Sequence, residues 1–376
     1  MLPAKHSVKR IKGDYRLIAI ADIHGHLDRF KTLLKKVDYN PSHDYLVIIG
    51  DFVEKGDQTI DTIRFVRELE RNPRCFVLIG NCEWAMTAIL QTPELANQIQ
   101  HYFAKIPRNG AIRDYYHQLH LDDGHETMLG IQREIEFKLH DDLQWMKHLP
   151  TTLKLNDFIF VHAGLPYANN YKSGILPDYL EMPYFMNQGH PYKEMVIVGH
   201  MPSSNYHHHN ITNNIIIDEE KRIISIDGGT GIKPVSQLNA LIIRSHDGVI
   251  TYECESVQPC MKGRIIKDHH PIKQKWHKIA YPYFKVTPIK TKGSLTYCHN
   301  EGLDEDLWIK NDFLYERGGQ WYCLDDYTDR QLDVARGEIV GIAGHYGDEI
   351  YAVKDGLVGW IPASCVQIIH KHNVRL

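Results

Sequence analysis

The sequence predicts an α/β domain with two sheets and a helical insertion, followed by one or two small β-barrels. Three observations indicate this order. Between Arg16 and Arg74, short apolar runs alternate with longer amphipathic segments. From Phe158 to about Cys254, apolar runs follow one another more densely. Beyond residue 283 the chain is rich in Gly, Tyr and Trp and has short alternating runs. Dense strands after a βα pattern indicate a second sheet, and short strands with many turns are typical of a barrel.

The first part of the chain predicts a βαβαβ unit. The runs "RLIAIAD", "YLVIIGD" and "CFVLIGN" are apolar throughout and end in Asp or Asn, as expected of parallel strands covered on both faces. The segments between them place apolar residues at helical spacing, which predicts two crossover helices; these residues are Phe30, Leu33, Leu34 and Val37 in the first segment, and Ile60, Ile63 and Val66 in the second.

A helical insertion is expected over about residues 84–150, where long polar stretches carry no strand signal. Strands resume at "FIFVHAGL" and "MVIVGHMP". The four apolar runs after them have no helices between them, so we expect a second sheet of antiparallel strands. The α/β domain would therefore occupy residues 1–257, as a two-sheet α/β sandwich.

The last third of the chain predicts a separate barrel region. Residues 258–282 are basic and irregular, as in a linker. Turn signals at Gly337, Asp348, Gly356 and Pro362 separate short strands in the region 283–376. The last barrel is expected over about residues 319–370, and residues 283–322 could form a second one of the same kind.

Composition narrows the function classes. With 43% hydrophobic residues, 24% charged residues and a net charge of −4, the chain resembles soluble globular proteins and is a poor general binder of nucleic acid or anionic membrane. No apolar run reaches the roughly 20 residues of a membrane helix. The seven cysteines lack CxxC spacing, which favours reduced thiols and a cytoplasmic location. The histidine run in "NYHHHN" is more typical of a solvated loop than of a metal site.

The chemistry is concentrated where the predicted strands end. Ligands of open α/β sheets bind at the carboxyl ends of the strands. The side chains expected there are Asp22, His24, Asp51, Asn81, Cys82, Glu83, His162 and His200. Each motif is weak alone, since a single DxH or VGH also occurs by accident. Together the nitrogen and oxygen ligands fit Mn, Fe or Zn better than Ca, and with Asp51 as a bridge they suffice for two ions.

The motifs "DIHGH", "GDFVEKGD", "GNCE", "FVHAGL" and "VGH" resemble the signature of the calcineurin-like metallophosphoesterases. The resemblance is greatest to the bacterial phosphoprotein phosphatases and their dinucleoside tetraphosphate hydrolase relatives, and it covers Arg16 to Cys254. It implies that Asp22 and His24 hold one divalent ion, that Asp51 bridges, and that the second ion is held by Asn81, His162 and His200. Mn is the expected metal, with Fe, Zn, Ni and Co as alternatives. A metal-bridging hydroxide would attack phosphorus.

Cys82 stands where this family usually has the histidine that protonates the leaving oxygen, helped by a neighbouring acidic residue. The resemblance therefore places Asp22, His24, Asp51, Asn81, Cys82 and Glu83 among the catalytic residues. Without a general acid, a poor leaving group departs about 10² to 10⁴ times more slowly. Three interpretations of Cys82 stay open: an acid or substrate contact, a small buried residue, and an extra metal ligand that selects a softer ion.

Lys55 is a second departure, because the family's phosphatases usually place an arginine there. An ammonium binds phosphate as a point charge and lacks the two-pronged grip of guanidinium. We therefore expect Lys55 and Asn81 to contact substrate, with Arg108 or Arg113 of the insertion as further phosphate ligands. An ordinary solvated arginine is the competing interpretation of each.

Residues 319–369 resemble an SH3 domain in "CLDDYTDRQLDVARGEIVGIAG" and "DGLVGWIPASCVQI". Ile350 and Tyr351 replace the usual tryptophan pair, and Cys365 replaces the groove tyrosine. The resemblance therefore favours a structural or substrate-recruiting module over a binder of proline-rich peptides.

The predicted function is two-metal hydrolysis of a phosphoprotein or a small phosphomonoester. Dinucleoside polyphosphate or phosphodiester hydrolysis is the alternative from the same class. A catalytically weak metal-binding scaffold acting through the SH3-like tail, with a peptide partner, is the alternative from another class.

Overall fold

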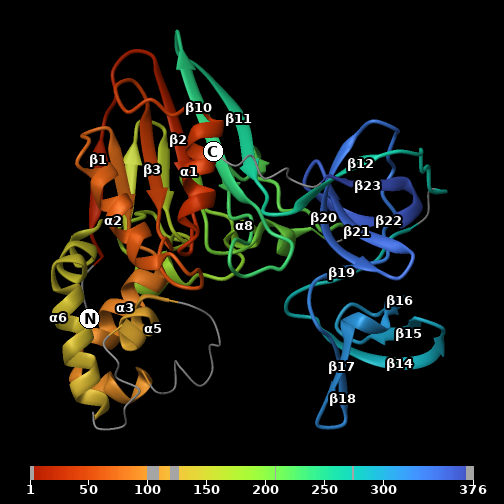
Figure 1. Cartoon of the computed structure of the whole chain (residues 1–376). Coiled ribbons are helices and arrows are strands. Elements are labelled where there is room, and N and C mark those ends of the chain that lie inside the picture. Colours follow the sequence, from red (N-terminus) through yellow and green to blue (C-terminus); the bar gives the residue numbers. More distant parts are fainter. Residues whose placement is uncertain (1–3, 100–109, 119–126, 208, 273–274, 370–376) are drawn as a thin grey trace, which may run out of the picture. The chain divides into compact units, whose positions relative to one another are not determined.

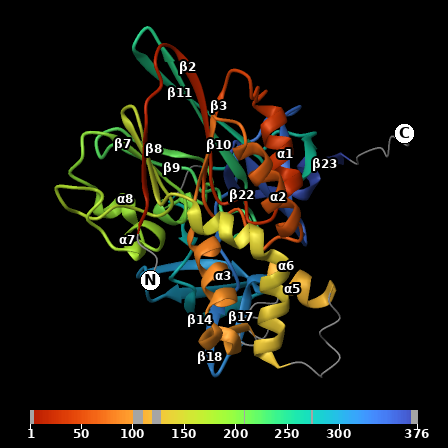
Figure 2. The ribbon, with the colours of Figure 1, turned by 90° about the vertical axis from the view of Figure 1, so that its left-hand side faces the viewer.

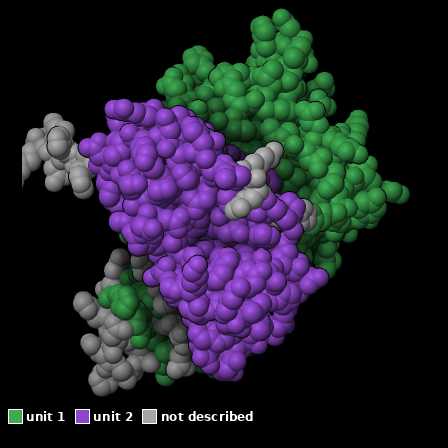
Figure 3. All heavy atoms as spheres, turned by 90° about the vertical axis from the view of Figure 1, so that its right-hand side faces the viewer, with its two compact units in different colours: residues 1–202, 215–232, 238–257 green, residues 203–214, 233–237, 258–376 purple. Residues whose placement is uncertain are grey.

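The computed structural model describes residues 4–99, 110–118, 127–207, 209–272 and 275–369. The chain divides into two compact units (Figure 3). The first consists of Met1–Pro202, Ile215–Ile232 and Leu238–Val257, and the second of Ser203–Asn214, Lys233–Gln237 and Gln258–Leu376. The main boundary between the two units follows Val257, and two short earlier segments belong to the second unit.

One sheet of the first unit contains the predicted βαβαβ unit (Figure 1). Its strands run in the order β11 (Val249–Val257), β10 (Leu238–His246), β2 (Tyr15–Ile20), β3 (Tyr45–Ile49) and β4 (Cys75–Leu78). β2, β3 and β4 are parallel, and they are joined by α1 (Leu27–Lys36) and α2 (Thr59–Glu70). α1 packs on β10 and β11, and α2 packs on β4.

The other sheet of the first unit is mixed, so the expectation of antiparallel strands was wrong. Its order is β1 (His6–Lys9), β5 (Thr152–Leu155), β6 (Phe158–Val161), β7 (Met195–Val198), β9 (Ile223–Ser225) and β8 (Ile216–Asp218). β6, β7 and β9 are parallel. The hairpin β10–β11 joins the first sheet instead, antiparallel to β2. Apolar runs show that a strand is buried but do not encode its partner, which explains the error.

The hydrophobic core lies between the two sheets. Alternate residues of β2, among them Leu17 and Ala19, pack in one cluster with residues of the other sheet such as Phe160, Ile197 and Ile224. The intervening Ile18 and Ile20 are also fully buried. Because successive strand residues point to opposite faces, β2 is covered on both sides, which accounts for its unbroken apolar run.

The described residues between β4 and β5 are largely helical. They comprise α3 (Asn81–Gln91), the short η1 (Pro93–Leu95), α5 (Ala111–Gln118) and α6 (Met128–His148), and Figure 2 shows the three longer helices. α6 packs against both α3 and α5. None of the helices described is both long and apolar enough to cross a membrane.

The second unit contains two five-stranded sheets. One runs β22 (Leu357–Pro362), β21 (Glu349–Lys354), β20 (Ile339–Tyr346), β12 (Met261–Ile265) and β23 (Val366–Ile369). The other runs β16 (Glu305–Lys310), β15 (Leu295–Asn300), β14 (Lys285–Lys292), β18 (Gln320–Cys323) and β17 (Leu314–Arg317), and a further pair joins β13 (Lys278–Ile279) to β19 (Tyr327–Thr328). Because β18 belongs to the second of these sheets, the expected start of the last barrel near residue 319 was too early.

The predicted linker 258–282 differs from expectation, because β12 is a central strand between β20 and β23. Lys262 and Arg264 are exposed while Gly263 and Ile265 are buried, so basic side chains on the outer face hid the strand pattern. The three positions that replace the SH3 aromatics are buried: Ile350 is 2%, Tyr351 3% and Cys365 4% exposed. They therefore offer no surface on which a proline-rich peptide could stack.

Candidate metal centre

The predicted metal ligands stand at the carboxyl ends of five strands of the first unit. Asp22 and His24 follow β2, Asp51 follows β3, and Asn81 begins α3 directly after β4. His162 follows β6, and His200 follows β7. Four of these residues have left-handed backbone angles, with φ of 54° at Asp22, 48° at His24, 49° at Asp51 and 67° at His200. Such strain costs energy at each non-glycine residue and is concentrated at functional sites.

Two glycines allow the carboxylates to approach the backbone. A Cβ atom on Gly199 would lie 2.2 Å from Asp22 Oδ2, and one on Gly80 would lie 2.2 Å from Asp51 Oδ1. His200 N donates to the same Asp22 Oδ2 at 3.0 Å. Any side chain at these glycines would therefore displace a predicted ligand.

Asp51 lies between two groups of ligand atoms. Its Oδ2 is 3.7 Å from His24 Nε2, and its Oδ1 is 3.5 Å from His162 Nε2. His24 Nε2 is 3.8 Å from Asp22 Oδ1, an oxygen to which none of the described residues donates a hydrogen bond. Asp51 belongs to both clusters of candidate ligands around it, as a bridging carboxylate would.

The second group centres on Asn81 Oδ1, which lies 2.9 Å from His162 Nε2 and 3.0 Å from His200 Nδ1. Backbone carbonyls orient two of the rings: Ile49 O lies 3.0 Å from His162 Nδ1, and Val53 O lies 3.2 Å from His24 Nδ1. A ring whose Nδ1–H donates to a carbonyl keeps Nε2 as an acceptor, which is the form that binds a metal ion.

The electrostatics of the centre favour a cation. Burial, and then the charges of Asp227 and Asp51, raise the pKa of Asp22 well above its ordinary value. Burial also opposes ionisation of Asp51, but its electrostatic interactions with His162, His24 and the ammonium of Lys55 outweigh burial and lower its pKa. Two buried carboxylates this close repel each other until a cation binds between them.

The histidines suit the same ion. Burial lowers the pKa of His200 to about 4, with His162 as the next cause, and burial also lowers the pKa of His24 well below its ordinary value. Both are therefore neutral near pH 7, as metal ligands must be. The residues present fit a pair of divalent ions, which would supply Lewis acidity toward phosphoryl oxygens and lower the pKa of water.

Glu83 lies against the loops that carry the candidate ligands. Its buried carboxylate accepts four backbone N–H groups, those of Gly80, Asp51, Phe52 and Val53, at 2.8–3.0 Å. Both oxygens are thus engaged by the loops after β3 and β4. This geometry favours a positioning role of Glu83 toward Asp51, and its catalytic role stays a prediction.

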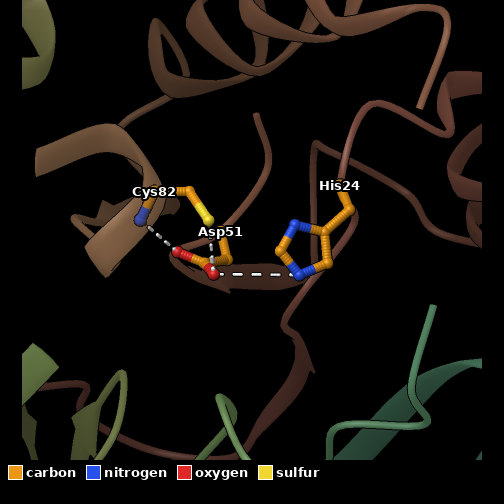
Figure 4. Close-up of side chains that lie close together, drawn as sticks. All are labelled: His24, Asp51 and Cys82. Carbon is orange, nitrogen blue, oxygen red and sulfur yellow. Dashed lines mark hydrogen bonds and ion pairs between the residues drawn. The ribbon is translucent and has the colours of Figure 1, made fainter. Parts of the chain in front are cut away.

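Cys82 lies inside the centre, beside Asp51 and His24 (Figure 4). Its backbone N–H donates to Asp51 Oδ1 at 2.8 Å, and its thiol donates to Asp51 Oδ2 at 3.0 Å. Lys55 also points into the centre, with Nζ 2.9 Å from His24 Nε2. Burial lowers the pKa of Lys55, but the surrounding acidic groups, among them Asp51, raise it overall, so its ammonium is charged there.

Of the two predicted phosphate-binding arginines, Arg108 lies outside the described residues, and Arg113 lies in α5. The role of each stays a prediction.

Sequence reasoning missed Glu54, whose only signal was an acidic residue in the loop "VEKG". Glu54 is 8% exposed, and its Oε1 accepts the N–H of Ala111, the first residue of α5, at 3.2 Å. It therefore ties the insertion to the loop that carries Lys55.

The ionisation of the buried Glu54 carboxyl group should be visible in the pH dependence of folding stability. Burial raises its pKa from 4.5 to about 8. A carboxyl with a raised pKa stabilises the fold fully below its unfolded pKa and loses that contribution as pH rises through the folded pKa. With a chelator present, urea unfolding should show wild-type stability falling between pH 4.5 and 8, by up to about 1.4 kcal/mol per pH unit relative to Glu54→Gln. Parallel pH profiles of the two proteins would contradict this.

The comparisons with known proteins agree with this geometry. A family model described as calcineurin-like phosphoesterase matches residues 15–212, more than half of the 376-residue chain. The chain belongs to this family. The expected metallophosphoesterase core is therefore confirmed.

Similar curated proteins share part of this core. A symmetrical bis(5'-nucleosyl)-tetraphosphatase of Yersinia enterocolitica is 30% identical over 146 residues, which is 39% of this chain and 40% of that protein. One of Chromobacterium violaceum is 28% identical over 149 residues, or 40% of this chain and 43% of that protein. The matches thus span less than half of these relatives. A solved structure of a candidate diadenosine tetraphosphatase aligns with a TM-score of 0.43 and 17% identity over 67% of this chain and 98% of that one.

Proposed function

We propose that this phosphoesterase uses two divalent ions to hydrolyse phosphoanhydrides, with dinucleoside polyphosphates as the substrate class. The observation that carries the proposal is the convergence of two aspartates, three histidines and one asparagine on adjoining positions that share Asp51. Positive charge at such positions neutralises the negative charge that develops on the phosphoryl oxygens in the transition state. Mn is the first metal to test, with Fe, Zn, Ni and Co as the others.

The surroundings of Cys82 favour an anhydride over a monoester. Burial, and then the charge of Asp51, raise the pKa of the thiol well above its ordinary value, and the thiol donates a hydrogen bond to Asp51 Oδ2. Such a thiol is a poor acid toward a leaving oxygen. An anhydride leaves as a phosphate anion and needs little protonation, whereas an alkyl monoester loses about 10² to 10⁴ in rate without it. The two curated relatives described above are named as tetraphosphatases of bis(5'-nucleosyl) substrates, which belong to the same class.

Lys55 supports binding of an anionic substrate. It carries a charged ammonium beside His24 and the two aspartates, within reach of the position where a phosphoryl group would meet the ions. A compact ammonium can bind any phosphoryl oxygen without requiring a particular orientation of the group.

A three-substrate comparison tests the proposal. Wild type supplied with Mn should hydrolyse diadenosine tetraphosphate with a higher kcat/KM than p-nitrophenyl phosphate or bis-p-nitrophenyl phosphate. Asp51→Asn, purified in the same way, reports any contaminating activity. If the enzyme hydrolysed p-nitrophenyl phosphate with the highest kcat/KM, the proposed substrate class would be wrong and phosphomonoesters would take its place. If none of the three substrates were hydrolysed with any of the five metals, the proposed activity would be wrong and the scaffold alternative would be favoured.

A further inference from the structure

Cys82 and Asn81 are neighbours in the first turn of α3, yet their side chains serve different parts of the centre. Asn81 Oδ1 lies beside His162 and His200. The Cys82 sulfur lies beside Asp51 Oδ2, in a cluster with His24 whose three ligand atoms all fall within 4.8 Å of one another. The two consecutive residues therefore face two adjoining ion positions, one each.

A positively charged side chain already lies at the cluster that contains the Cys82 sulfur. The ammonium of Lys55 lies 2.9 Å from His24 Nε2, and His24 belongs to the same cluster as the Cys82 sulfur. The charge of Asp51, the third member of that cluster, favours the protonated form of Lys55. A divalent ion bound among these groups would take over a charge that Lys55 now supplies.

The other interpretations of Cys82 account for less of this geometry. A space-filling residue would not need its sulfur among carboxylate and imidazole groups, since a buried thiol packs equally well against apolar side chains. A general acid would have to release its proton to the substrate, but the thiol donates to Asp51. A ligand role uses both the position of the sulfur and its neighbours.

We propose that Cys82 is a thiolate ligand of the ion that Asp22, His24 and Asp51 hold. When this ion binds, the S–H bond breaks, a sulfur–metal bond forms, and one proton is released to solvent. Thiolates prefer softer ions, so this position would select Zn, Fe or Co over Mn, while the position of Asn81, His162 and His200 keeps only nitrogen and oxygen ligands. The inference rests on the two-ion centre of the proposed function, and it makes the centre chemically asymmetric.

Cobalt substitution tests the ligand directly, without measuring activity. Wild type loaded with Co²⁺ should show a sulfur-to-cobalt charge-transfer band in the near ultraviolet, and binding should release one proton more than in Cys82→Ser. The band should be lost in Cys82→Ser and Cys82→Ala while both variants still bind cobalt. Cys254→Ser is the matched control, because Cys254 is an exposed thiol on β11 of the same unit and its loss should leave the band unchanged.

Metal competition gives a second readout. Replacing the thiolate should lower the affinity for Zn relative to Mn by at least about tenfold in Cys82→Ser, since even outer groups around a metal change affinity by about 10- to 100-fold. Circular dichroism of each variant shows whether it is folded before metals are added.

The outcomes separate this inference from the proposed function. A wild type that binds cobalt and hydrolyses a substrate but shows no charge-transfer band, or a band that persists in Cys82→Ser, overturns the thiolate ligand and leaves the function standing. A wild type with the band but no hydrolysis of any substrate keeps the ligand and overturns the function. A wild type that binds no cobalt overturns both.

Discussion

Asp51→Asn is expected to abolish turnover, with a loss of at least about 10³ in kcat/KM, or about 4 kcal/mol of transition-state stabilisation. Asp51 is the one carboxylate in both ligand clusters around it, and its two oxygens face His24 and His162 separately. An amide supplies a single neutral oxygen and cannot serve two cations. Steady-state kinetics and metal analysis after dialysis should show the loss of activity together with loss of at least one ion per chain.

Asp38→Asn is the matched control for this variant. Asp38 has nearly the same left-handed backbone, with φ of 50° against 49° at Asp51, but it is exposed at the end of α1. The same chemical change in the same conformation should therefore leave kinetics and metal content unchanged. An Asp51→Asn protein that keeps both ions and normal turnover would show that this carboxylate is not shared.

Glu83→Gln is expected to destabilise the fold by about 2 to 5 kcal/mol. The carboxylate satisfies four buried backbone N–H groups, two on each oxygen. Glutamine offers one oxygen and turns an NH₂ group toward the other two donors, and each unsatisfied buried donor costs about 1 to 3 kcal/mol. Urea unfolding of the metal-free protein measures the loss.

The variant also separates positioning from catalysis. Because Glu83 holds the backbone of Asp51, we expect weaker metal affinity in Glu83→Gln, with turnover partly restored by excess metal. Glu94→Gln, in the exposed η1 of the same insertion, should change stability by less than about 0.5 kcal/mol. An unchanged urea midpoint for Glu83→Gln would contradict the role assigned to its hydrogen bonds.

The local pattern was sufficient for the elements that carry the chemistry. Each apolar run ending in Asp, Asn or His marks a strand covered on both faces, and parallel strands bring their carboxyl ends to one edge. For this reason the meeting of the candidate ligands, from Asp22 after β2 to His200 after β7, could be expected from the sequence before any distance was known. The local pattern also indicated the helical insertion, because the residues there lack the periodicity of strands.

The sequence left strand pairing open, because burial does not identify a partner. The apolar sequence of β10 would suit either sheet. Its pairing with β2 is what shows that it belongs to the first sheet. β12 was hidden in a basic segment because Lys262 and Arg264 face solvent while Gly263 and Ile265 face the core. Long-range contacts decided both cases.

By itself, the sequence determined which residues could bind metal, since residue type and position at a strand end depend only on local chemistry. Only the tertiary structure decided what the neighbours of Asn81 do. Glu83 turns toward the backbone of the loop after β3, and Cys82 turns toward Asp51, although the two are adjacent in the chain. The direction of a side chain in the first turn of a helix depends on what packs around it, and those groups come from residues about 30 positions away.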